Sequence, residues 1–150
     1  MEKNTYLLLF FAILAGGVIP LQSALNSKLG SNLEHPIQAS VVSFGVGFIF
    51  IFTIALFFAN KMPSMIQVTS LPWYYYLGGM LGVVFVTTVI LLVPEIGTAN
   101  MLAGAIVGQL IVSAVFDHFA LFGLPKTPLT LQRSIGIILL IVGVFLVAKK

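Results

Sequence analysis

The sequence predicts an all-α integral membrane protein with five transmembrane helices. Of its 150 residues, 59% are hydrophobic and only 7% are charged, whereas soluble domains carry about 25% charged residues. The mean hydropathy of +1.14 also excludes a disordered chain, because disorder requires low hydrophobicity and high charge. A bilayer core of about 30 Å needs about 20 apolar helical residues to cross it, and the chain contains five such runs.

Short stretches rich in glycine, proline and polar residues separate these runs. The connections VPEIG (93–97) and FGLPKTP (122–128) are typical of breaks between helices. Pro36 suits the first turn of the second helix, and PWYYY (72–76) is typical of an aromatic belt at the membrane surface. Because no linker is long enough to separate a second domain, we expect one transmembrane domain over residues 1–150. The predicted spans are residues 5–26, 36–59, 73–93, 98–120 and 131–148.

The N-terminal run could also be the apolar part of a cleaved signal peptide. However, it continues through Val18, and the polar residues Gln22, Asn26 and Lys28 follow without a clear small-residue cleavage site. We therefore expect a retained first span.

Lysine and arginine give little indication of orientation. An odd number of spans places the two termini on opposite sides of the membrane, and positive charge normally marks the inner side. Here four basic residues lie on the N-terminal side and three on the other. Either another feature sets one orientation, or both orientations are inserted. The two sets are Lys3, Lys61, Lys126 and Arg133, and Lys28, Lys149 and Lys150.

The composition argues against several other classes of protein. The absence of cysteine excludes disulfide scaffolds and thiolate metal sites. There is no basic run or basic patch with interleaved aromatics, so we expect no nucleic-acid partner, and the net charge of +3 suits anionic membrane lipids. No metal-ligand cluster and no pairing of nucleophile and base is recognisable, so we expect neither an enzyme nor a cofactor.

Four segments of the chain are distinctive in combination: GVIPLQSALNSKLG (17–30), PWYYYLGGMLGVVFV (72–86), GQLIVSAVFDHFALFG (108–123) and GIILLIVGVFLV (136–147). Together they resemble the YdcZ-like family, a group of short five-helix proteins in the drug/metabolite transporter superfamily. The resemblance covers nearly the whole chain. It implies a half-transporter in the bacterial inner membrane that pairs with an inverted copy of itself, or with a sister protein, to form ten helices. It also implies export of small metabolites or drug-like solutes.

The last helix carries a candidate dimer interface. Gly136 and Gly143 are seven residues apart and share one helix face with Leu140, and small residues let helices approach closely in lipid. The segment GIILLIVGV (136–144) also resembles the dimerisation motif of small multidrug resistance transporters. We expect this face to contact the second copy of an antiparallel homodimer, which the level charge count would permit. Packing against helices of the same subunit is the alternative.

Polar side chains on two helices are candidates for a solute pathway. Gln22 and Asn26 are four residues apart on one face of the first helix, and Gln109 and Ser113 repeat that spacing in the fourth. Such stripes should face the bundle or a watery cavity, because facing lipid is costly. Pro20 removes a backbone donor and is expected to kink the first helix; broken helices often surround transporter sites, although a merely tolerated kink is equally compatible.

Asp117 and His118 lie near the predicted C-terminal end of the fourth helix, where the helix dipole disfavours an anion. One interpretation is an ion pair of Asp117 with Arg133 or Lys126. The other is a protonatable pair at the mouth of the pathway that couples protons to transport. A gate that is also an ion pair would satisfy both.

The resemblance, together with the level charge count, implies an antiparallel dual-topology homodimer that transports by alternating access. Small multidrug resistance transporters use a glutamate in their first helix, but no acid occurs in this first span, so that mechanism does not carry over. The mostly neutral pathway favours a neutral, zwitterionic or lipophilic solute. A dual-topology channel and a structural subunit of a larger membrane complex are the alternatives.

Overall fold

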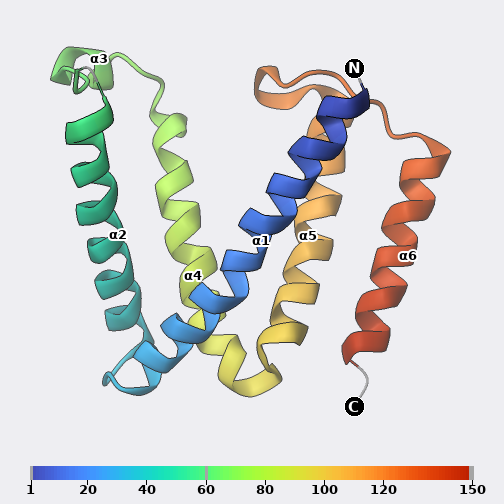
Figure 1. The fold of residues 1–150 in the computed structure, drawn as a ribbon, viewed down its shortest axis with the longest axis horizontal. Coiled ribbons are helices and arrows are strands. Elements are labelled where there is room, and N and C mark those ends of the chain that lie inside the picture. Colours follow the sequence, from blue (N-terminus) through green and yellow to red (C-terminus); the bar gives the residue numbers. More distant parts are fainter. Residues whose placement is uncertain (1, 60, 149–150) are drawn as a thin grey trace. The chain divides into compact units, whose positions relative to one another are not determined.

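The computed structural model describes residues 2–59 and 61–148, and the side chains from Thr5 onward. Lys149, Lys150 and the Lys3 side chain, which entered the charge count, lie outside this described part. The described residues form helices without any strand, as predicted (Figure 1). The elements are α1 (Glu2–Ser31), α2 (Pro36–Phe58), α3 (Met65–Thr69), η1 (Trp73–Tyr76), α4 (Leu77–Ile96), α5 (Thr98–Phe119), η2 (Leu121–Gly123) and α6 (Leu131–Ala148).

Five helices in the described part are long and apolar enough to cross a bilayer, which confirms the five-helix membrane class. Two of them extend beyond the predicted spans: α1 continues to Ser31 and α4 to Ile96. Hydropathy marks only the apolar part of a helix, whereas backbone hydrogen bonds continue into polar residues. Most of VPEIG is therefore helical, and the break falls at Gly97, whose φ of 83° suits a residue without a side chain.

Side-chain caps fix where two of the helices begin. At the start of α2, the Ile37 N–H donates to His35 Nδ1 at 3.2 Å, and the His35 N–H donates to Gln38 Oε1 at 3.3 Å. Ser64 and Gln67 form the same reciprocal arrangement before α3. Each cap satisfies backbone donors that the first turn of a helix leaves without a partner.

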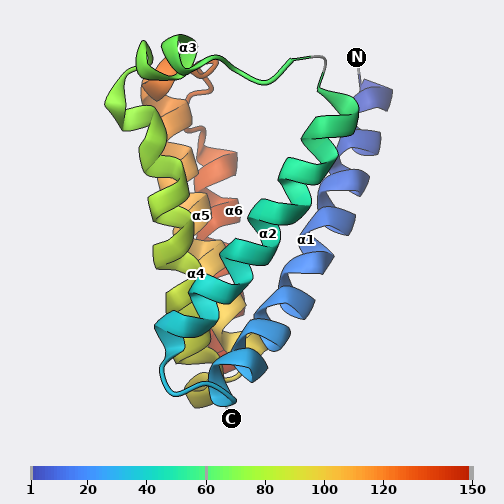
Figure 2. The same cartoon turned by 90° about the vertical axis from the view of Figure 1, so that its left-hand side faces the viewer.

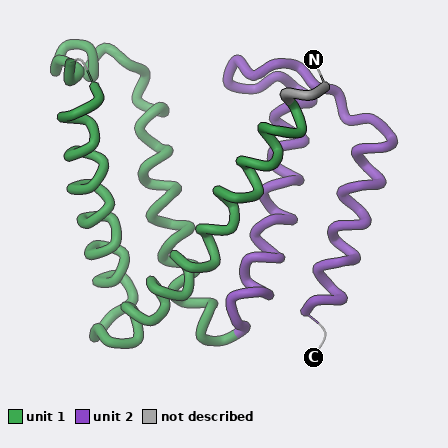
Figure 3. The backbone as a smooth tube through the Cα atoms, viewed as in Figure 1, with its two compact units in different colours: residues 1–95 green, residues 96–150 purple. Residues whose placement is uncertain are grey.

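The chain divides into two compact units, residues 1–95 and 96–150 (Figure 3). In the first unit α1 packs against α2, and Figures 1 and 2 show the two helices close together near the loop that connects them. Near the α1–α2 connection, Ala39 of α2 and Val86 and Ile90 of α4 form a small buried cluster. Beside it, the hydroxyls of Ser40 and Thr87 share a hydrogen bond of 2.8 Å, so α2 and α4 are joined by both apolar and polar contacts.

In the second unit α5 packs along α6, and η2 folds back against α5. Ala120 ends α5 with a φ of 52°, and Phe122 follows with a φ of 57°. These left-handed residues turn the chain so that the Phe122 ring meets Phe116 edge to face, with 5.3 Å between ring centroids. An aromatic contact therefore holds a backbone conformation that is costly for residues with a side chain.

Large apolar side chains cover much of the described surface. Phe57 and Phe58 are 80% and 82% exposed, and Leu131 is 79% exposed. Such a surface would be unstable in water but suits hydrocarbon, where the helical backbone is satisfied internally. The helices thus present their apolar side chains outward, toward lipid or another membrane protein.

Gly30 brings α1 close to α4, and we predict that Gly30→Ala destabilises the first unit. An added Cβ would lie 2.6 Å from Ile90 Cγ2, and a β-branched side chain cannot easily rotate away. The matched control is Gly82→Ala, which gives a similar gain in helix propensity but meets only the Phe44 ring at 3.6 Å. In detergent, the free energy of unfolding should be about 1–3 kcal/mol lower for Gly30→Ala than for the control. Equal stabilities would contradict the close packing at Gly30.

Candidate functional site

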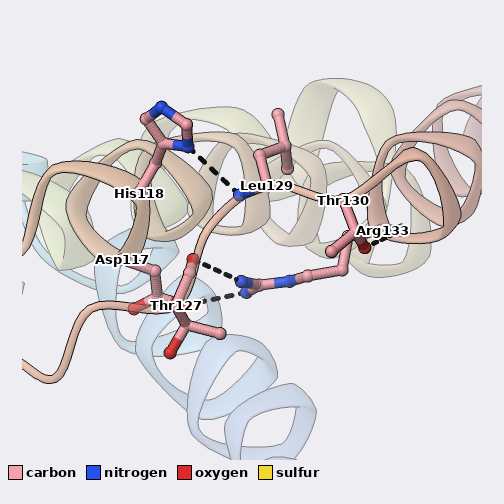
Figure 4. A network of polar contacts seen from close by, with 6 residues as sticks. All are labelled: Asp117, His118, Thr127, Leu129, Thr130 and Arg133. Carbon is pink, nitrogen blue, oxygen red and sulfur yellow. Dashed lines mark hydrogen bonds and ion pairs between the residues drawn. The ribbon is translucent and has the colours of Figure 1, made fainter.

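An ion pair joins the end of α5 to the start of α6. Arg133 Nη2 donates to Asp117 Oδ2 at 2.8 Å, and Arg133 Nη1 donates to the Thr127 carbonyl at 3.0 Å (Figure 4). The Thr127 N–H in turn donates to the Asp117 carbonyl at 2.9 Å. The three residues therefore fasten the connecting loop to both helices.

Helix electrostatics explain why these two charges pair. Asp117 lies in the last turn of α5, where the dipole is negative, and Arg133 lies in the first turn of α6, where it is positive. Each charge is thus unfavourable beside its own helix end, and each compensates the other. The side chains of Arg133 and Asp117 are 36% and 32% exposed, so solvent screens the pair and its net contribution is at most about 1 kcal/mol.

His118 bonds to the loop and not to Asp117. The Leu129 N–H donates to His118 Nδ1 at 3.1 Å, which requires that nitrogen to be unprotonated (Figure 4). The two neighbouring side chains point in different directions, one to the loop backbone and one to Arg133. The ion pair considered from the sequence is therefore present, with Arg133 as the partner of Asp117. His118 forms a second hydrogen bond that holds the same loop.

The predicted pathway residues on α1 lie in different surroundings. Gln22 is exposed and lines a groove of about 340 Å³ between α1 and α2, whereas Asn26 is buried. The chain remains helical through Pro20, whose missing N–H leaves the Gly16 carbonyl without its usual helical donor. The α1 pair thus consists of one accessible amide and one enclosed amide.

The predicted pathway residues on α5 belong to the second unit. Gln109 and Ser113 are both exposed on this helix, as the stripe pattern requires if they face a cavity or another protein surface. The structure describes Gln22 and Asn26 in one unit and Gln109 and Ser113 in the other. Their convergence on a common pathway remains a prediction.

The two glycines of α6 have open space beside them among the residues of the second unit that the structure describes. A Cβ added at Gly136 or Gly143 would meet no described atom within 4 Å. Leu140 and Gly143 line a groove of about 380 Å³ between α5 and α6, opposite Ala103 and Ile106. Close packing between α5 and α6 therefore does not account for glycine at these two positions.

Ser43 is a candidate site residue that the sequence reasoning missed. It lines the same groove as Gln22, together with Phe44, Phe48 and Gly47. A signal was available in the spacing of Ser40, Ser43 and Gly47, which places all three on one face of α2. Hydroxyls are common in membrane helices and often bond to their own backbone, so the spacing alone was a weak signal.

The described residues contain no group of three or more histidine and carboxylate side chains that could hold a metal ion. The chemistry offered by these sites is hydrogen bonding from amides and hydroxyls, together with one ion pair at a helix connection. These groups can recognise and position a small molecule.

Comparisons with known proteins agree with the resemblance seen in the sequence. A family model described as "Putative inner membrane exporter, YdcZ" matches residues 7–146. The chain is also 30% identical over 148 residues to "Inner membrane protein YdcZ" of Escherichia coli (strain K12), and the alignment covers 98% of each chain. No solved structure matches this chain.

We predict that Asp117→Asn loosens the loop between α5 and α6, because Arg133 loses its ionic acceptor. Trypsin in detergent should then cleave after the exposed Lys126 about two- to fivefold faster, as expected for a partly exposed ion pair. The fragment that begins at Thr127 can be followed by mass spectrometry. Glu95→Gln, which removes an acid outside this hairpin, serves as the control and should cleave at the wild-type rate. A wild-type rate for Asp117→Asn would contradict the fastening role.

Proposed function

The chain belongs to the YdcZ-like family of inner-membrane exporters, and on this basis we propose that it exports small metabolites or drug-like solutes by alternating access as an antiparallel dual-topology homodimer. It is a multi-pass inner-membrane protein. Membership of an exporter family favours transport over enzymatic catalysis. The direction of transport, the antiparallel homodimer and the residues of the solute pathway all belong to the proposal.

The observation that carries the proposal is the exposure of polar side chains within the spans. Gln22, Gln109 and Ser113 are exposed on helices that otherwise present apolar residues. Amide and hydroxyl groups are costly against lipid tails, so such groups should face a watery pathway or protein. A pathway between two subunits would provide both surroundings.

Two further features support an inverted pair. The nearly equal division of basic residues gives neither orientation a clear advantage during insertion. Gly136 and Gly143 leave open space on α6 where the helix of a second copy could approach closely. We therefore assign Gly136, Leu140 and Gly143 to the dimer contact, and Gln22, Asn26, Gln109 and Ser113 to the pathway.

We assign Asp117, His118 and Arg133 to holding the α5–α6 loop at the mouth of the pathway. Arg133 occupies one oxygen of the carboxylate, and the Leu129 N–H occupies His118 Nδ1. The two titratable groups bond to different partners instead of to each other. This arrangement supports a fastening role over a role as proton carrier.

The dual orientation is tested by single cysteines, because the natural chain contains none. Glu34 and Met62 are exposed in connections on opposite sides of the predicted topology, and replacing either leaves the lysine and arginine count unchanged. An impermeant thiol reagent applied to intact cells should label about half of each variant, as expected when neither orientation is favoured. Labelling of one variant fully and the other not at all would exclude the antiparallel homodimer.

Proton coupling is tested in liposomes that contain the purified protein. A panel of small metabolites is screened for saturable, solute-induced proton movement and for counter-transport, because a channel would show neither saturation nor counter-transport. We expect Asp117→Asn to retain proton movement with any solute that drives it in the wild type, because the carboxylate fastens a loop. Loss of proton movement with preserved solute exchange would show instead that Asp117 carries the proton.

A further inference from the structure

We propose that the groove between α1 and α2 is a solute subsite for an uncharged molecule that carries a hydrogen-bonding group on an aromatic or aliphatic body. The inference rests on the proposed function and names the class of solute for one part of the pathway. The groove has a volume of about 340 Å³, at the small end of the roughly 300–1,000 Å³ found for ligand pockets. It therefore suits part or all of one small molecule.

The polar edge of the groove consists of the Gln22 amide and the Ser43 hydroxyl. Several other span hydroxyls are satisfied within the protein: Ser23 and Thr53, for example, each donate to a carbonyl four residues earlier at 2.8 Å. Neither Gln22 nor Ser43 forms a side-chain hydrogen bond with the residues that the structure describes. Because an unsatisfied polar group is costly in a membrane interior, these two groups are available to a ligand.

The absence of charged side chains from the walls of the groove favours an uncharged solute. Residues 5–27 and 36–58, which supply both walls, contain no charged side chain. An ionic solute would therefore lose hydration without gaining a counter-charge from either helix. Glutamine both donates and accepts hydrogen bonds, and so does serine. An amide, a hydroxyl or a similar neutral group on the solute can use both residues.

The remaining wall is apolar and largely aromatic. Phe44, Phe48 and Ile51 line the groove, and the Phe44 ring also lies against Gly82 of α4, 3.6 Å from the position of an added Cβ. The ring is thereby supported from behind by a helix of the same unit. Aromatic rings favour aromatic or aliphatic partners, which defines the body of the solute.

Gly47 provides a way to fill the groove without disturbing the fold. It lines the groove, and a Cβ added there would meet no described atom within 4 Å. Gly45 also has open space around its Cβ position, but it does not line the groove and projects about 200° away around the helix. Gly47→Val therefore tests the groove, and Gly45→Val is its matched control.

The experiment uses three photoreactive probes that differ mainly in charge: 4-benzoylbenzamide, 4-benzoylbenzoate and 4-(aminomethyl)benzophenone. The full-length protein in lipid nanodiscs is irradiated with each probe, and labelled peptides are mapped by mass spectrometry. We expect only the uncharged amide to label peptides of α1 and α2 in a manner that excess benzamide suppresses. Labelling should fall about fivefold in Gln22→Met and in Ser43→Ala, as expected for loss of one hydrogen bond. It should fall at least as much in Gly47→Val and stay unchanged in Gly45→Val.

Other results would overturn the inference. Equal labelling in Gly47→Val and Gly45→Val, or equal labelling by the charged probes, would show that the groove does not select the solute. Absence of labelling, together with a smaller dimer fraction of Gly47→Val in light scattering, would show that a second copy covers the groove.

The probe experiment requires neither transport nor two orientations, so it separates this inference from the proposed function. If cysteine labelling showed one orientation while the amide probe still labelled the groove, the homodimer proposal alone would fail. If a solute were exported normally by Gly47→Val and the groove remained unlabelled in the wild type, this subsite alone would be wrong.

Discussion

Water is absent from the core of a bilayer, so each polar group that this chain carries there needs a partner from the protein or from a solute. Most of the span hydroxyls meet that requirement inside the described structure. Ser23, Thr53 and Thr88 bond to carbonyls of their own helices, and Ser40 and Thr87 bond to each other. Gln22 and Ser43 lack a bond of this kind, and they lie in the same groove. Gln109 and Ser113 of α5 also form no side-chain hydrogen bond with the described residues, so the candidate site is identified by the groove that Gln22 and Ser43 share.

At the membrane edge a different constraint applies, because charge is permitted there but must suit the helix ends. Asp117 and Arg133 are each unfavourable beside the end of their own helix and favourable beside each other. With the His118–Leu129 hydrogen bond, their pairing fastens a loop that contains two left-handed residues other than glycine and no regular α-helix. Two of the few charged residues in the sequence therefore stabilise the structure of the α5–α6 connection. The predicted first span, residues 5–26, in contrast contains no acid.

Open space around the helical glycines connects the single subunit to its proposed assembly. Gly30 and Gly82 meet neighbouring side chains within the first unit, whereas Gly136 and Gly143 meet none among the described residues. Close approach of a second helix would explain the glycines of α6, just as close packing explains Gly30 of α1 and Gly82 of α4. A five-helix chain with a level distribution of basic residues is compatible with that arrangement. At Gly47, by contrast, we propose that a solute and not a second helix occupies the open space.

The sequence by itself determined the class of protein and the number of spans, because apolar length and scarcity of charge depend only on composition and order along the chain. It also identified Arg133 as one of two possible partners for Asp117, since both lie near helix ends on the same side. The choice of Arg133 over Lys126, the separate hydrogen bond of His118 and the groove shared by Gln22 and Ser43 were decided by tertiary structure. These features depend on which faces of two helices meet and on the path of a loop, and residue spacing constrains neither. Helical periodicity places Gln22 and Asn26 on one face, but only packing determines that the first is exposed and the second buried.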